Sequence, residues 1–329
     1  MIQLIDSYNR HINYLRISIT DRCNLRCIYC MPKEGISLIG HDDILSYEEL
    51  LRIACIAVKK GITKIRITGG EPLARKGVVQ FVSALSGIQG IQDLSMTTNG
   101  ILLSPAAQPL RSAGLKRLNI SLDSLNPDKY TMITRGGDIN QIIAGMKSAQ
   151  EAGFSPIKIN VVVIRGINDD EITSFAKLSM EKNLQVRFIE YMPVGMENGW
   201  EKERFVSADE IRQSIKTIGP LLELPSDNGS GPAQMYTIEG AQGRLGFISA
   251  LSDHFCATCN RLRLTPDGKL RTCLFSDAEV DLKTKVRQGC SDDALADIIN
   301  EAILSKPQKH HATEQVFKKC IRGMSAIGG

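Results

Sequence analysis

Two hydrophobic patterns alternate along the first half of this chain. Short runs rich in β-branched and apolar residues are separated by longer segments in which apolar positions recur with a helical period. The first pattern is typical of buried strands, and the second of helices that bury one face. Strands are therefore predicted at Leu15–Thr20, Lys64–Thr68, Asp93–Thr98, Arg117–Leu122, Lys158–Ile164 and Val186–Tyr191. Helices are predicted at Tyr47–Lys60, Gly77–Leu85, Ser104–Ala113, Asn140–Ala152 and Asp170–Lys182.

The ends of several predicted helices carry capping signals. Ser46 is followed three residues later by Glu49, and Asn168 by Glu171. In such a pair the short polar side chain accepts a free backbone N–H, and the carboxylate reaches back to the start of the helix. Glycines that suit a left-handed C-terminal cap follow three of the helices, at Gly61, Gly114 and Gly153.

The alternation of strands and helices with short links predicts a parallel sheet with right-handed crossovers. Six strand–helix units can be counted, fewer than the eight of a closed TIM barrel. We therefore expect an α/β fold of the incomplete (β/α)6 TIM-like type. A doubly wound sheet is an alternative that periodicity alone leaves open.

The pattern changes after about residue 195. Ser207 and Glu210 predict another capped helix, and the Gly/Pro/Ser-rich stretch 225–232 predicts a loop. Met235–Glu239 and Arg244–Ser249, joined by a glycine-containing turn, predict a hairpin. We expect residues 1–220 to form the partial barrel and residues 221–329 to form a C-terminal extension.

Composition narrows the class of protein. Apolar residues make up 43% of the chain and charged residues 23%, as in ordinary globular proteins. The net charge of +4 is too small to predict a general nucleic-acid surface. No apolar run is long enough to span a membrane, and the first ten residues lack a signal-peptide pattern. A cytoplasmic location is therefore expected, where nine cysteines are more readily explained as ligands than as disulfides.

Three cysteines follow the first predicted strand directly, as C-x3-C-x2-C: Cys23, Cys27 and Cys30. Active sites of parallel α/β barrels lie at this end of the strands. A four-iron cluster usually takes four thiolates, so three thiolates leave one iron free to bind another molecule. Part of a zinc site is the alternative, but structural zinc usually needs four ligands, and His11 and His41 lie at no zinc-like spacing.

The segment Cys23-Asn-Leu-Arg-Cys27-Ile-Tyr-Cys30 resembles the signature of the radical S-adenosylmethionine (SAM) superfamily. The resemblance implies a 4Fe–4S cluster on these three thiolates, with SAM bound to the open iron. Reductive cleavage of SAM would then yield a 5′-deoxyadenosyl radical. In such enzymes the cofactor carries the chemistry, and the protein binds and orients the reactants.

The same resemblance implies where SAM is bound. The Gly69-Gly70-Glu71-Pro72 turn is similar to the segment that binds the methionine part of SAM, and paired glycines let a ligand approach the backbone closely. The implied SAM contacts are Tyr29, Gly70, Ser121 and Met192. Each taken alone is as compatible with packing as with ligand contact, but they share positions at the C-terminal ends of strands.

A second group of three cysteines comprises Cys256, Cys259 and Cys273. A predicted strand and an Asp-Gly turn between them would bring Cys273 back toward the other two. A zinc ribbon with His254 as the fourth ligand is an alternative. Alternation places Arg261 and Arg263 on one face of that strand, where a guanidinium pair suits bidentate phosphate binding. Solvated surface arginines are the simpler explanation, but these two lie between metal ligands.

The stretch from Phe255 to Phe275, and the chain as a whole, resembles the GTP 3′,8-cyclase family of molybdenum cofactor biosynthesis. The resemblance implies a second 4Fe–4S cluster on Cys256, Cys259 and Cys273, in contact with the guanine base. The implied GTP contacts are Arg16, Arg66, Thr97, Lys158, Arg261, Leu262 and Arg263. The last two residues, Gly328 and Gly329, match the family's C-terminal double glycine, a tail that reaches the active site. Without the family they indicate only a frayed terminus.

The implied fold is a radical SAM partial barrel whose C-terminal extension carries the second cluster. The implied reaction is that of a lyase. The radical removes the ribose 3′-hydrogen of GTP, and C3′ then attacks C8 to give (8S)-3′,8-cyclo-7,8-dihydroguanosine 5′-triphosphate. The implied partners are an electron donor and the downstream cyclic pyranopterin synthase, with no nucleic acid and no membrane. The sequence leaves a monomer and a homodimer equally open.

Two other functions remain open at this point. One is a different radical SAM enzyme with an auxiliary cluster, such as a peptide-modifying enzyme, although no peptide-binding module is recognisable. The other is a zinc protein that binds nucleic acid, which the near-neutral charge and the α/β core disfavour. Cys55, Cys290 and Cys320 match no motif and are expected to be packing thiols.

Overall fold

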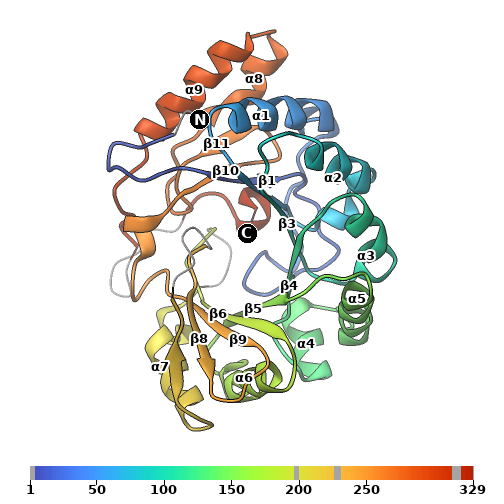
Figure 1. The fold of residues 1–329 in the computed structure, drawn as a ribbon, viewed down its shortest axis with the longest axis vertical. Helices are drawn as coiled ribbons and strands as arrows, with labels where there is room; N and C mark the ends of the chain where they lie inside the picture. Colours follow the sequence, from blue (N-terminus) through green and yellow to red (C-terminus); the bar gives the residue numbers. More distant parts are fainter. Residues whose placement is uncertain (1–3, 196–199, 226–230, 313–319, 329) are drawn as a thin grey trace.

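The computed structural model describes residues 4–195, 200–225, 231–312 and 320–328. Its framework is one curved sheet of twelve strands with helices on the outer side (Figure 1). The C-terminus lies on the inner side of this curve (Figure 1). No helix in the described ranges is long and apolar enough to cross a membrane.

Six parallel strands form the centre of the sheet. They are β1 (Tyr14–Ser18), β2 (Lys64–Thr68), β3 (Asp93–Thr98), β4 (Arg117–Ser121), β5 (Ile157–Val163) and β6 (Leu184–Glu190). Each pairs in parallel with the next along the chain. A doubly wound sheet would reverse its strand order at a switch point, and this sheet does not. The prediction of an incomplete (β/α)6 barrel is therefore confirmed.

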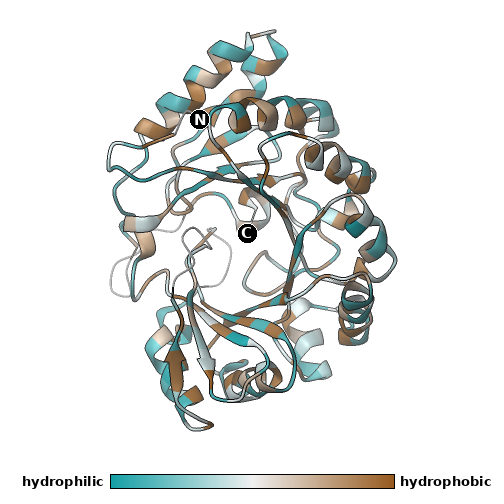
Figure 2. Cartoon of the chain, viewed as in Figure 1, coloured by the Kyte–Doolittle hydropathy of each residue, from teal (hydrophilic) through white to brown (hydrophobic). Residues whose placement is uncertain are grey.

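The helices pack their apolar faces against the outer side of the sheet, as the hydropathy colouring indicates (Figure 2). The barrel helices are α1 (Tyr47–Lys59), α2 (Val78–Ser86), α3 (Leu103–Ser112), α4 (Pro127–Thr134), α5 (Ile139–Glu151) and α6 (Ile172–Glu181). The later helices are α7 (Ala208–Lys216), α8 (Leu282–Arg287), α9 (Asp292–Leu304) and the short α10 (Met324–Ile327). The helices α4, α8, α9 and α10 were not predicted from the sequence; α4 is short and begins at Pro127 after an Asn126 cap.

Most of the predicted capping signals are confirmed. Ser46 and Glu49 form a reciprocal capping box at α1, and so do Ser207 and Glu210 at α7. The three glycines after helices have left-handed backbones: Gly61, Gly114 and Gly153. Left-handed backbone is nearly free of strain only for glycine, so these positions end their helices sharply.

The predicted cap by Asn168 and Glu171 is wrong. Asn168 instead accepts a bond from the Ile164 N–H and donates to the carbonyl oxygens of Asp123 and Val162. Glu171 accepts bonds from the Ser124 hydroxyl and the Leu125 N–H. Both side chains therefore hold the ends of β4 and β5 together, and a 3-10 turn (Asp169–Glu171) precedes α6.

The C-terminal extension adds strands to both edges of the barrel sheet. On one edge, β9 (Arg244–Ile248) runs parallel to β6 and forms the predicted hairpin with β8 (Gln234–Ile238), beyond which lies β7 (Leu221–Glu223). On the other edge, β10 (Arg261–Leu264) runs parallel to β1. It turns back into β11 (Lys269–Arg271), which pairs with β12 (Val280–Asp281). We call Cys23, Cys27 and Cys30 the first triple, and Cys256, Cys259 and Cys273 the second triple. The strand β10, between cysteines of the second triple, is thus a neighbour of β1, the strand that precedes the first triple.

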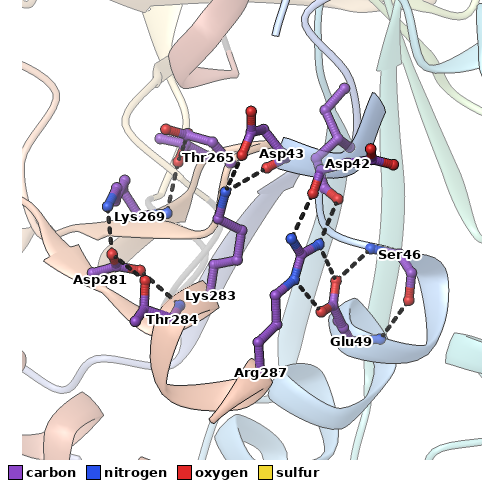
Figure 3. Close-up of polar contacts among 12 residues, drawn as sticks. Asp42, Asp43, Ser46, Glu49, Thr265, Lys269, Asp281, Lys283, Thr284 and Arg287 are labelled. Atoms are coloured by element: carbon purple, nitrogen blue, oxygen red, sulfur yellow. Dashed lines mark hydrogen bonds and ion pairs between the residues drawn. The ribbon is translucent and has the colours of Figure 1, made fainter. Parts of the chain in front are cut away.

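Polar contacts join this second edge to the start of α1 (Figure 3). From α8, the Arg287 guanidinium contacts the Glu49 carboxylate at 2.8 Å, and Lys283 contacts Asp43 at 3.1 Å. Asp281 caps α8 by accepting the Thr284 N–H at 3.0 Å and pairs with Lys269 at 2.7 Å. These contacts connect α8 to the start of α1, and β11 to the strand that precedes α8.

Candidate active site

The loop after β1 brings the three cysteines of the first triple to the wall of one cavity. The predicted SAM contacts Tyr29, Gly70, Ser121 and Met192 line the same cavity. They follow four different strands, so the parallel sheet gathers them at its C-terminal edge. Thr97, predicted as a GTP contact, also lines this cavity. Its hydroxyl is buried with no hydrogen-bond partner among the described residues.

The glycine pair before Glu71 is required by the chain itself. A Cβ on Gly69 would lie 2.6 Å from the Thr20 carbonyl oxygen, and one on Gly70 would lie 2.4 Å from the Arg22 carbonyl oxygen. These glycines let the turn after β2 donate backbone hydrogen bonds to the loop after β1. The close approach expected here for a ligand is therefore made, at least in part, by the cysteine-bearing loop.

Glu71 is fully buried and connects the turn after β2 to the end of β3. It accepts hydrogen bonds from the Leu73 N–H, the Thr98 hydroxyl and the Asn99 N–H. Burial raises the pKa of Glu71 to about 6. Asn99 in turn points its side-chain amide at the Cys23 sulfur, 3.7 Å away. The turn after β2 and the end of β3 thereby fix the position of the first cysteine.

Burial raises the pKa of all three thiols in the first triple, that of Cys30 to about 12. Such thiols ionise when a cationic centre binds them, because metal ligation and deprotonation are coupled. The Tyr29 hydroxyl, between two of the cysteines, donates a 2.7 Å hydrogen bond to Asp123. Burial raises the pKa of Asp123 to about 6. Asp123 also lines the cavity, and sequence analysis did not identify it.

The second triple lines a second cavity, named the arginine cavity below. Five arginines line it as well: Arg16 from β1, Arg66 from β2, Arg187 from β6, and Arg261 and Arg263 from β10. Within the described residues no aspartate or glutamate contributes to its wall. Arg187 was missed by sequence analysis, because the run that contains it was interpreted only as an apolar strand.

These guanidiniums lie close together, and no carboxylate among the described residues of the cavity wall balances their charge. Burial, followed by repulsion from Arg263 and Arg66, lowers the pKa of Arg16 well below its usual value. Burial and the charge of Arg66 lower the pKa of Arg187 to about 9. The Nε atoms of Arg16 and Arg187 are buried with no hydrogen-bond partner in the described part of the chain. Buried charges of one sign require an oppositely charged partner, so this cavity is suited to a polyanion.

Two of the predicted GTP contacts, Leu262 and Lys158, line neither cavity. The Leu262 side chain is in the apolar core, on the opposite face of β10 from its arginine neighbours, so only its backbone is available to a ligand. Lys158 is buried on β5, and its side chain lines neither cavity. Tyr14, which was not predicted as a site residue, also lines the arginine cavity. Its buried hydroxyl has no hydrogen-bond partner among the described residues.

The two cavities adjoin. Four residues line both of them: Asn160, Ile189, Met192 and Met324. Met324 belongs to the C-terminal tail, which therefore lies at the boundary between the first and second triples. A molecule in the arginine cavity is next to whatever occupies the cavity of the first triple.

The C-terminal tail lies inside the curve of the sheet, beside β1, β2 and β10. The Gly328 carbonyl oxygen accepts a 2.6 Å hydrogen bond from Arg263. A Cβ on Gly328 would lie 2.3 Å from the Thr68 hydroxyl oxygen, so no larger residue fits there. Gly329 lies outside the described residues.

The remaining thiols line neither cavity. Cys290 packs against the core and Cys320 is buried, and none of the nine cysteines, all within the described ranges, forms a disulfide. Among the described residues, no three His, Cys, Asp or Glu side chains converge on a point where a single metal ion could bind. The thiols of the first triple line one cavity, and those of the second triple line the other.

Comparison with known proteins agrees with this geometry. Residues 17–179 match the radical SAM superfamily, and residues 184–312 match the family Molybdenum Cofactor Synthesis C. The GTP 3′,8-cyclase of Thermodesulfovibrio yellowstonii is 55% identical over 328 residues, which cover 98% of this chain and 99% of that protein. The GTP 3′,8-cyclase of Moorella thermoacetica is 49% identical, with 98% and 99% covered.

Solved structures resemble the fold more distantly. SuiB from Streptococcus suis, bound to S-adenosylmethionine, superposes with a TM-score of 0.62 at 14% identity, over 95% of this chain and 78% of SuiB. Methylornithine synthase (PylB) superposes with a TM-score of 0.51 at 16% identity, over 63% of this chain and 62% of PylB. These likenesses concern the fold, whereas the full-length relatives share the sequence as well. The chain belongs to the GTP 3′,8-cyclase family of radical SAM enzymes.

Proposed function

We propose that this chain converts GTP to 3′,8-cyclo-7,8-dihydro-GTP, with SAM in the cavity of the first triple and GTP in the arginine cavity. The observation that carries the proposal is the contact between the two cavities, one lined by the cysteines of the superfamily motif and the other by five arginines without a carboxylate. A nucleoside triphosphate provides the negative charge that the arginine cavity lacks.

Cys23, Cys27 and Cys30 would hold a 4Fe–4S cluster, and Cys256, Cys259 and Cys273 a second one. When bound, the first cluster and SAM supply the radical that removes the ribose 3′-hydrogen. The residues of the chain bind and orient the reactants around that chemistry. Arg16, Arg66, Arg187, Arg261 and Arg263 hold the triphosphate. The guanine base then lies toward the second triple, which lines the arginine cavity and not the cavity of the first triple.

Residues shared by the two cavities determine the approach of the ribose to SAM. Asn160 has a buried side-chain oxygen with no hydrogen-bond partner in the described chain, and it faces both cavities. A ribose hydroxyl is the kind of donor that this oxygen needs. Positioning of this kind is a large part of what a protein contributes to radical transfer. An electron donor and a cyclic pyranopterin synthase would act before and after this step.

The proposal is tested by incubating the anaerobically reconstituted protein with SAM, a reductant and either GTP or ATP. The 3′-hydrogen that GTP loses to 5′-deoxyadenosine is replaced by an electron from the reductant and a proton from water, so we expect a new compound with the mass of GTP and a different retention time. ATP should give no such product. Release of 5′-deoxyadenosine with GTP recovered unchanged would contradict the proposed function.

A further inference from the structure

The C-terminal tail is tied down where it enters the barrel. Arg322 stands immediately before the tail segment 323–328 and directs its guanidinium toward two carboxylates. Its Nη1 and Nη2 atoms contact the two oxygens of Asp267 at 3.1 and 2.8 Å. Its Nε atom contacts Glu279 at 2.7 Å. A bidentate carboxylate contact with a second carboxylate alongside is the strongest arrangement that one arginine offers.

The two carboxylates belong to the part of the fold that surrounds the second triple. Asp267 lies in the turn between β10 and β11, and Glu279 directly precedes β12. Burial alone would raise the pKa of Asp267, but the hydrogen bond and charge of Arg322 outweigh burial and lower it. All three side chains are at most 24% exposed, so water screens the contact only partly.

Beyond this contact the tail touches both halves of the site. Met324 lines both cavities, and Ser325 lines the cavity of the first triple. Gly328 accepts the hydrogen bond from Arg263. Arg322, Asp267 and Glu279 themselves line neither cavity. An effect of Arg322 on the reaction can therefore pass through the tail, whereas Asp267 and Glu279 also bond to Thr265 and Arg271 of the β10–β11 hairpin.

We propose that Arg322, held by Asp267 and Glu279, is a positioning residue that keeps the C-terminal tail seated between the two cavities. This contact of Arg322 with Asp267 and Glu279, named the latch below, fixes the base of the tail, and the hydrogen bond to Gly328 fixes its tip. The catalytic part of this proposal rests on the proposed function, because it assigns the seated tail to the cyclisation of GTP. The structural part, that the latch holds the tail, does not depend on that function.

The test compares Arg322→Ala with Arg287→Ala. Arg287 also pairs with a carboxylate in the extension (Figure 3), but it lies far from the tail in sequence and lines neither cavity. Hydrogen exchange of the peptide that contains residues 323–328 reports seating without any need for activity. We expect exchange about tenfold faster or more in Arg322→Ala and unchanged in Arg287→Ala. Equal tail exchange in the two variants would overturn the latch.

Activity then tests the catalytic part. In Arg322→Ala we expect cyclic product to form roughly ten- to a hundredfold more slowly, with the KM for GTP within about threefold of the parent. Uncoupled release of 5′-deoxyadenosine should persist, and Arg322→Lys should recover part of the loss. Faster tail exchange with an unchanged rate of cyclisation would overturn the positioning role.

A second pair of variants guards against misfolding. If Arg322→Ala does not fold, Asp267→Asn removes the carboxylate charge at nearly constant shape, with Asp281→Asn as its control in the neighbouring Lys269 pair. Faster tail exchange in Asp267→Asn alone supports the latch, and equal exchange in both refutes it. A parent protein that makes no cyclic product refutes the proposed function, while the exchange comparison still decides the latch.

Discussion

The Nη1 atom of Arg263 donates a 2.6 Å hydrogen bond to the carbonyl oxygen of Gly328. This bond joins the strand between the second-triple cysteines to the tip of the C-terminal tail. Arg263 is also one of the five arginines of the arginine cavity, and a guanidinium has five hydrogen-bond donors. One residue can therefore hold the tail and a phosphate together, which places the tip of the tail beside the substrate.

Gly328→Ala is expected to unseat the tip of the tail. Gly328 has a φ of 82°, and an added Cβ would lie 2.3 Å from the Thr68 hydroxyl oxygen. Folding and iron content should be unchanged, GTP affinity should change little, and cyclic product should fall by about a hundredfold. Gly289→Ala is the matched control, because Gly289 has a φ of 76° but open space around it. Full cyclase activity in Gly328→Ala would show that the tip has no role.

Arg187→Ala should weaken GTP binding by about 2–5 kcal/mol, the cost of removing one partner from a buried charge contact. Calorimetry on the anaerobic protein measures the effect. Arg52→Ala is the control, since Arg52 lies on the surface and pairs with Asp292, so its loss should cost less than about 0.5 kcal/mol. A weakening of GTP binding below that limit in Arg187→Ala would exclude Arg187 from the triphosphate site.

The same substitution makes a second prediction, for the protein without substrate. Arg187 is 4% exposed and is repelled by Arg66. Its removal relieves a buried charge that has no counterion in the cavity wall. The free energy of unfolding without GTP should therefore stay the same or rise, as measured by denaturant titration. A marked loss of stability would mean that Arg187 is a structural strut instead of an anion ligand.

Substituting one cysteine of each triple should separate their roles. The intact protein should bind about eight irons, four per cluster. Cys27→Ala should lose about half of them and all cleavage of SAM, whereas Cys259→Ala should lose the other half and retain uncoupled cleavage. Cys55→Ala, at a thiol outside both triples, serves as the control. Stoichiometric zinc without sulfide in the parent protein would end the cluster assignment.

The barrel could be predicted from the sequence because its information is local. β2 (Lys64–Thr68) and β3 (Asp93–Thr98) match the predicted bounds, and the capping box at Ser46 marks the start of α1. The error at Asn168 has a physical reason. A short polar residue before a helix can bond to any nearby backbone group, and here the ends of two strands lie closer than the first turn.

The two edges of the sheet could not be predicted in the same way. The pairing of β1 with β10 joins residues such as Tyr14 and Arg261, which are distant in sequence. No local pattern specifies such a partner. Arg187 was missed for a related reason. Only the registers of β5 with β6 and of β6 with β9 reveal that its side chain faces the same space as Arg16 and Arg66.

We propose that the arginine cavity presents the ribose of GTP to SAM in the cavity of the first triple. GTP deuterated at C3′ tests it most directly, in an anaerobic reaction with reductant, SAM and the full-length protein. We expect the released 5′-deoxyadenosine to carry the deuterium, and a cyclic product with the mass of unlabelled GTP to accumulate alongside it. Deuterium that stays in recovered GTP while unlabelled 5′-deoxyadenosine accumulates would contradict the claim.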